Sequence, residues 1–138
     1  MSLFQQPVFI NLCSSDLERM RTFWTALGAD INEEYTATDM CLCVILTDST
    51  YAMYLTPQHY ENFTGGRPRA DTLATSAALL ALTVGTREEV DRVAETALKA
   101  GATEVELTEE IRTEMGQAGM HVREIVDPDG HQWEFCTA

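Results

Sequence analysis

Residues 8–29, VFINLCSSDLERMRTFWTALGA, contain the change of hydrophobic pattern that decides the fold. The first six of them are mostly apolar, include the β-branched Val8 and Ile10, and predict a β-strand. Ser15 or Asp16 then caps a predicted helix whose apolar residues recur at helical spacing, and Gly28 suits the left-handed residue that ends such a helix. The stretch therefore predicts one strand followed by one amphipathic helix.

The segments after this helix predict three further strands. ADINEEY, residues 29–35, reads as a short strand, and MCLCVILT and YAMYLT, within residues 40–56, read as a hairpin. Residues 57–76 are rich in glycine, proline and polar side chains, which predicts a connection with at most a short helical turn. The first half of the chain is therefore predicted to have the order β-α-β-β-β.

The same order of patterns begins again at ALLALTV, residues 78–84. Thr86 and Glu89 have the spacing of a capping box at the start of a second helix, and Gly101 follows its end. Three more strands are predicted within residues 102–111, 119–126 and 131–137. This repetition is typical of an internal duplication, in which Phe9 and Leu79 occupy equivalent places.

We therefore predict an α+β fold of two tandem βαβββ units that form a single domain over residues 1–138. The repeats cover about residues 6–56 and 77–137, and the loop at 57–76 joins them. A chain of 138 residues is large enough to bury a core without disulfide or metal staples.

Composition excludes several classes of protein. No run approaches the roughly 20 apolar residues of a membrane span, and the first residues lack the pattern of a secretory signal, so we expect a cytoplasmic protein. A net charge of -13 disfavours nucleic acid and anionic membranes as partners. The four cysteines have no Cys-x-x-Cys spacing, which favours reduced, mostly buried thiols over a zinc site or a disulfide scaffold.

The duplicated order resembles the vicinal oxygen chelate superfamily of glyoxalases, bleomycin-resistance proteins and extradiol dioxygenases. NLCSSDLERMRTFWTALGA, residues 11–29, and DPDGHQWEF, residues 127–135, carry the most specific similarity, which extends over nearly the whole chain. The resemblance implies that each unit curls its sheet into a half-barrel and that the two units enclose a cup for a small molecule. It also implies a homodimer, because members of the superfamily often pair their subunits around the cup.

Members with metal chemistry place two ligands from each unit on its first and last strands, where a divalent ion stabilises an enolate or activates dioxygen. Glu134 matches the last-strand carboxylate, but Phe9 and Leu79 stand where the family has His or Gln. A register shift of two residues brings Asn11 and Ala81 to these positions, which improves the ligand set little. We therefore expect a glyoxalase-like protein that lacks most metal ligands and has a metal-free cup without a cofactor. The alternative is bound Ni, Zn, Fe or Mn with Glu134 as a ligand.

The last hairpin supplies the candidate catalytic residues. A turn over residues 127–130 predicts that Arg123 lies opposite Glu134 and His121 opposite Cys136, all on one face. Glu134 is then a candidate general base or ligand anchor, assisted by Arg123 and His121. The alternative is a cross-strand salt bridge between Glu134 and Arg123 beside a hydrogen-bonded histidine.

Five further residues are candidates for the wall of the ligand site. They are Phe9, Asn11, Cys13, Leu79 and Tyr54. The aromatic and thiol side chains are explained equally well as core packing.

Three functions remain open. The missing metal ligands favour a protein that binds a small molecule in a metal-free cup, as the drug-resistance members do. The second is a metal-dependent lyase or isomerase, similar to lactoylglutathione lyase, or a dioxygenase, acting on a carbonyl or aromatic substrate. The third is a metal-free enzyme with Glu134 as base and Arg123 as electrostatic stabiliser, so the sequence leaves open whether the protein is an enzyme.

Overall fold

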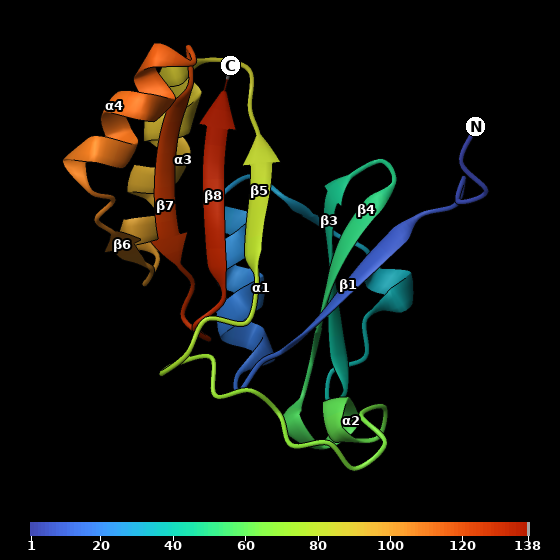
Figure 1. Ribbon diagram of the computed structural model, residues 1–138. Helices are drawn as coiled ribbons and strands as arrows, with labels where there is room; N and C mark the ends of the chain where they lie inside the picture. The colour runs from blue at the N-terminus through green and yellow to red at the C-terminus, as the bar shows by residue number, and fades with distance from the viewer. Residues whose placement is uncertain (138) are drawn as a thin grey trace. The chain divides into compact units, whose positions relative to one another are not determined.

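The computed structural model describes residues 1–137 and divides the chain into two compact units, Met1–Arg69 and a second unit from Ala70 onward. Each unit has a four-stranded mixed sheet, in which the first strand pairs in parallel with the last and the other neighbours are antiparallel (Figure 1). Within residues 1–137 neither sheet closes into a barrel. The predicted α+β fold with two βαβββ units is confirmed.

The first unit follows the predicted order with one difference. Its elements are β1 Val8–Cys13, α1 Leu17–Ala26, β2 Asp30–Ile31, the 3-10 helix η1 Glu33–Tyr35, β3 Cys41–Thr47, β4 Thr50–Leu55 and α2 Pro57–Glu61. Asp16 caps α1 by accepting a hydrogen bond from the Arg19 amide, and Gly28 has the expected positive φ of 95°. The strand predicted over residues 29–35 ends early, because the Asn32 side chain accepts from the Tyr35 amide and starts η1.

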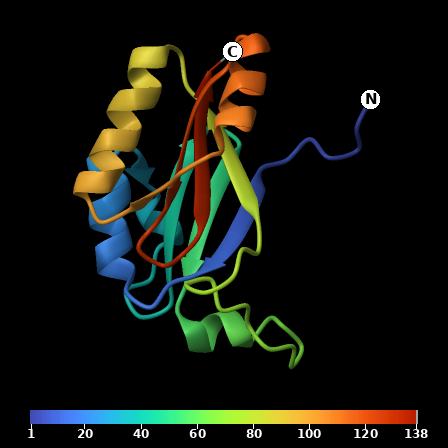
Figure 2. The same ribbon diagram turned by 60° about the vertical axis from the view of Figure 1, so that its left-hand side comes forward.

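The second unit contains one helix that the sequence reading missed. Its elements are β5 Leu79–Thr83, α3 Arg87–Lys99, β6 Thr103–Val105, α4 Glu109–Gln117, β7 His121–Val126 and β8 Gln132–Thr137. The strand predicted over residues 102–111 is therefore wrong in its second half, where Thr108 caps α4 by accepting from the Ile111 amide. Helices α3 and α4 lie on opposite sides of β7 and β8 (Figure 2).

Each sheet buries one face against the long helix of its own unit. Helix α1 buries Met20, Phe23 and Trp24 over β3 and β4, and α3 buries Val90, Ala94 and Ala97 over β7 and β8. Burial of each large apolar side chain contributes about 2 kcal/mol, so these faces dominate the stability of both units. No helix within residues 1–137 has the length and apolar character needed to cross a membrane.

The hairpin between β7 and β8 has a three-residue loop. The Asp127 amide donates to the His131 carbonyl at 2.8 Å, and the Gly130 amide donates to the Asp127 carbonyl at 2.9 Å. Gly130 has a φ of 90°, as in hairpin loops that combine a type I turn with a left-handed residue. Asp127 and His131 therefore close the loop. The predicted pairing requires a two-residue loop, so the loop is one residue longer than predicted.

Glycine is required at position 130 for a second reason. A Cβ atom there would lie 2.2 Å from the backbone oxygen of Thr72, which cannot move like the end of a flexible side chain. We expect Gly130→Ala to lower the free energy of unfolding by on the order of 3 kcal/mol, from backbone strain and this clash together. Urea denaturation measures the loss.

Gly119→Ala is the matched control, because Gly119 also has a positive φ, 78°, but a Cβ there would meet nothing within 4 Å. We expect it to lose only about 1 kcal/mol. Equal losses in the two variants would mean that the contact with Thr72 does not limit the conformation of the loop.

Candidate functional site

The hairpin register places two carboxyl groups side by side on the sheet face that points away from α3. Glu124 of β7 lies directly opposite Glu134 of β8, and Ala81 of β5 is the partner of Glu134 on its other side. Glu124 is only 7% exposed, and the side-chain amide of Gln132 donates a hydrogen bond to it. The sequence reading missed Glu124, although a loop with glycine at its last position is the signal for the longer connection.

Burial and the neighbouring Glu124 alter the protonation of Glu134. Burial raises the pKa of Glu134 first, and the hydrogen bond and negative charge of Glu124 raise it further. The pair therefore keeps a proton to higher pH than an exposed glutamate does. Such a pair can donate a hydrogen bond to a ligand oxygen, and in its ionised form it can accept a proton.

The structure does not bring Arg123 and His121 to Glu134. Arg123 lies opposite Phe135 and His121 opposite Thr137, so the predicted pairings with Glu134 and Cys136 are wrong. The cause is the three-residue loop, since a shift of one residue moves every side chain of a strand to the other face. The catalytic roles of these two residues stay predictions, but they would act on the face opposite the carboxyl pair.

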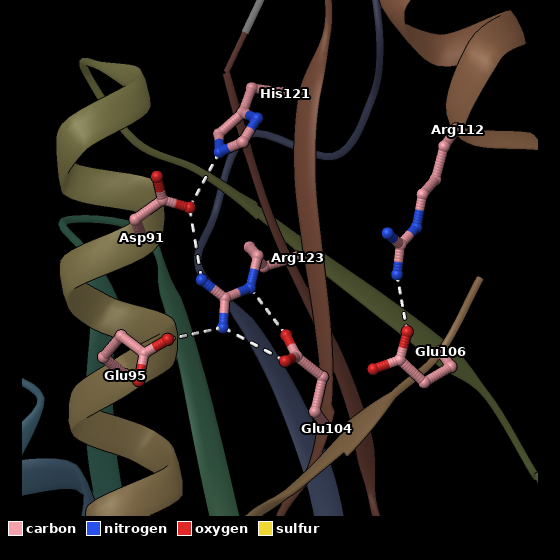
Figure 3. Close-up of polar contacts among 7 residues, drawn as sticks. All are labelled: Asp91, Glu95, Glu104, Glu106, Arg112, His121 and Arg123. Carbon is pink, nitrogen blue, oxygen red and sulfur yellow. Dashed lines mark hydrogen bonds and ion pairs between the residues drawn. The ribbon is translucent and has the colours of Figure 1, made fainter. Parts of the chain in front are cut away.

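Arg123 instead forms the centre of an ion cluster that joins three elements (Figure 3). Its guanidinium donates to Glu104 of β6 at 2.6 Å, to Glu95 of α3 at 2.9 Å and to Asp91 of α3 at 3.2 Å. Nε2 of His121 lies 2.8 Å from the same Asp91 oxygen. The pKa of Arg123 is raised mainly by its hydrogen bond to Glu104, and that of Asp91 is lowered mainly by its hydrogen bond to His121. The cluster holds β6 and β7 to α3 and stays charged.

Phe9 and Asn11 share the sheet face of the first unit that points away from α1. Phe9 lies beside Tyr51 in the sheet, and their rings stack with centroids 5.0 Å apart and an interplanar angle of 16°. The ring of Tyr35 is tilted against Phe9 at 6.2 Å. Asn11 is the neighbour of Met53 on the same face. This face is therefore an aromatic surface with one amide.

Cys13 lies on the same face as Phe9, next to a cation. Nη1 of Arg69 is 3.6 Å from its sulfur, and Nε of Arg69 donates to Glu61 at 2.8 Å. The pKa of Arg69 is raised by Glu61 first and then by Cys13. The sequence reading did not pair these residues, because 56 positions separate Cys13 from Arg69.

The remaining two candidates lie in contrasting surroundings. Tyr54 is fully buried on the face that packs against α1, where its hydroxyl accepts a hydrogen bond from Nε1 of Trp24 at 2.9 Å. Leu79 is 68% exposed and lies beside Gln132, on the same face as Glu134. Within the first unit the structure therefore places Tyr54 on the face opposite Phe9, Asn11 and Cys13, and the ligand-binding role of all five candidates stays a prediction.

The residues at the expected metal positions do not fit a tightly held transition metal. In the second unit Glu134 is paired with Ala81, and in the first unit Met53 and Asn11 take the equivalent places. The neighbouring pairs on the same faces are Phe9 with Tyr51 and Leu79 with Gln132. They offer no better ligands for a transition metal. Among residues 1–137, no group of three or more His, Cys, Asp or Glu side chains is arranged to hold a metal ion.

Removal of Arg123 tests the ion cluster. Its side chain is 19% exposed, and Arg123→Met would leave three carboxylates without their shared cation. We expect the free energy of unfolding to fall by about 2 kcal/mol in urea denaturation. Arg112→Met is the matched control, because its ion pair with Glu106 is between side chains 60% and 77% exposed, and we expect about 0.5 kcal/mol or less. An equally small loss for Arg123→Met would contradict a structural role for the cluster.

The raised pKa of Glu134 predicts a pH-dependent stability. The folded state binds this proton more tightly than the unfolded state, so the group's contribution is full below its ordinary pKa of 4.5 and is lost as pH rises through the raised value. Glu134→Gln removes the titration, so the variant should gain stability relative to the native chain as pH rises through this window. Urea denaturation across a pH series measures this difference.

Glu114→Gln removes an exposed carboxylate from α4 and controls for the loss of one negative charge. If the stability difference between Glu134→Gln and the native chain did not grow with pH, the raised pKa of Glu134 would be contradicted.

Comparison with known structures shows that the fold is shared with other proteins. The chain resembles hypothetical protein SA1046 from S. aureus, with 23% identity over 99% of this chain and 96% of that chain and a TM-score of 0.74. A glyoxalase-related enzyme from Fulvimarina pelagi has 19% identity over 98% and 89% of the two chains, with a TM-score of 0.74.

A fosfomycin resistance protein from Listeria monocytogenes, solved with Mn(II) and 1S,2S-dihydroxypropylphosphonic acid, has 16% identity over 98% and 90% of the two chains, with a TM-score of 0.62. At these identities the likeness shows the fold alone. No curated protein matches the chain. The sequence model of one family matches residues 6–135, and the chain therefore belongs to the Glyoxalase/Bleomycin resistance protein/Dioxygenase superfamily.

Proposed function

We propose that this protein binds a small organic molecule, without a bound metal, on the sheet face that carries Glu134. The observation that carries the proposal is the pair of Glu124 and Glu134, which stands where the family resemblance expects one metal ligand. Asn11, Met53 and Ala81 at the other expected positions offer no strong donor for a transition metal. Members of the family with metal chemistry hold a metal at these positions, and the residues of this chain do not fit one.

The chemistry of the pair favours a ligand with an oxygen acceptor. A carboxyl pair that retains a proton donates a hydrogen bond to a carbonyl or similar group, while exposed Leu79 beside it offers apolar contact. The net charge of -13 opposes nucleic acid as a partner of this surface.

A metal-free proton transfer is the second candidate function. A carboxyl group with a raised pKa is a stronger base once ionised, and Glu134 lies within hydrogen-bond reach of a second acid that could take part in the transfer. Arg123 points to the other face of β7. Glu124 therefore occupies the position opposite Glu134 that the sequence analysis predicted for Arg123.

The test combines metal analysis with ligand binding on the full chain. We expect less than a tenth of an equivalent of Ni, Zn, Fe or Mn in purified protein, and stabilisation in thermal shift by a thiol adduct, a keto acid or an aromatic compound. A ligand present at 100 times its Kd stabilises the fold by about 2.7 kcal/mol. Glu134→Gln should weaken the best binder at least tenfold, about 1.4 kcal/mol, and Glu114→Gln should leave binding unchanged.

The results separate the alternatives. A near-stoichiometric metal that Glu134→Gln removes would overturn the proposal in favour of a lyase, isomerase or dioxygenase. Turnover that Glu134→Gln abolishes while binding survives would favour the proton-transfer enzyme.

A further inference from the structure

A cavity of about 460 Å³ lies at the edge of the second sheet, where β6 ends before β7 does. Strand β6 pairs only with residues 124–126 of β7, so residues 121–123 have no strand neighbour on that side. The chain instead turns into α4, and side chains of β6, α4 and β7 line the space between them. Cavities of 300–1,000 Å³ are typical of small-molecule sites.

The acidic side chains that line this cavity are already engaged. Glu104 accepts from Arg123 at 2.6 Å, Glu106 accepts from Arg112 at 2.6 Å, and Glu124 accepts from Gln132. Figure 3 shows Arg112 reaching from α4 to Glu106, away from the cluster around Arg123. Glu104 and Glu124 are therefore held by part-buried partners, whereas the pair of Glu106 with Arg112 is exposed to solvent.

Of the three arginines that line the cavity, Arg123 is bound to three carboxylates, but the other two are less firmly held. Among residues 1–137, the guanidinium of Arg87 has no ion-pair or hydrogen-bond partner. Arg112 has only its solvent-exposed pair with Glu106, which exchanges partners at little cost. Two guanidinium groups are therefore able to bind an anionic group of a ligand.

A second feature of the cavity, which does not depend on charge, is Gly116. It lies within α4 without a positive φ, where glycine destabilises a helix relative to alanine. It lines the cavity, and a Cβ atom at this position would meet no protein atom within 4 Å. Gly116 therefore leaves open space on the wall of the cavity, where a larger side chain would reduce its volume.

We propose that this cavity binds a small organic anion with an apolar body. The carboxylate or phosphate group of the ligand pairs with Arg87 and Arg112, and its body packs against Val105, Val122 and Met115. The cavity adjoins the face around Glu134, because Val122 and Glu124 of β7 line it and point to that face, but Glu134 itself is not among the residues that line the cavity. The protein then has two ligand sites on its second unit.

Isothermal titration of the full chain with hexanoate and with hexyl phosphate tests the proposal, and neutral hexanamide is the control for the apolar body alone. We expect at least one of the anions to bind ten times more tightly than hexanamide. Arg87→Gln should weaken the anion at least fivefold, while Arg92→Gln, which removes an exposed charge of α3 outside the cavity, should not.

Gly116→Phe should abolish binding by filling the cavity, with circular dichroism and urea denaturation confirming that the variant folds. Absence of binding by both anions, or binding that survives Gly116→Phe and Arg87→Gln, would overturn the proposal. Glu134→Gln should leave anion binding within twofold, so that a failure of the Glu134 site and a failure of this cavity are told apart.

Discussion

The side chain of Asp127 holds the loop on which the arrangement of the second unit depends. It is 3% exposed, and its Oδ1 accepts hydrogen bonds from the amides of Asp129 and His131 at 2.9 and 3.0 Å. Its Oδ2 accepts from Nε1 of the buried Trp133 at 2.9 Å. Hydrogen bonds to a charged acceptor contribute about 1.5–3 kcal/mol each. One carboxylate thus ties the loop to the core and fixes which residues of β7 and β8 face each other.

This register gives the two faces of β7 different chemistry. Glu124 points to the face that carries Glu134, where two acids share one environment and hold a proton. Arg123, which precedes Glu124 in the sequence, points to the α3 side of the sheet. There it binds the carboxylates of Asp91 and Glu95 of α3 and of Glu104 of β6. A strand can keep opposite charges one residue apart in this way because successive side chains lie on opposite sides of the sheet.

The two units share a backbone pattern but differ in the side chains on the sheet faces that point away from α1 and α3. Positions toward the helix stay apolar in both, as Tyr54 and Phe135 do, because burial against α1 or α3 supplies most of the stability. The outward positions lack that constraint, so Met53 takes the place in the first unit that Glu134 takes in the second. Aromatic and thiol groups dominate the first face, whereas carboxyl groups dominate the second.

The sequence by itself determined most of the elements, the duplication and the superfamily, but not η1 or α4. Strand and helix periods, the Asp16 and Thr86 caps and the terminating glycines are local features. It also identified Glu134, but it paired that residue with Arg123 rather than Glu124. Only the tertiary structure decided which residue lies opposite Glu134. The loop that ends at Gly130 is one residue longer than predicted, which moves every side chain of the strand to the other face. Thr72, distant in the sequence, occupies the space that a Cβ atom at position 130 would need. The glycine at the end of the loop is a local signal for the longer connection, but the contact with Thr72 is set by the packing of residues distant in the sequence.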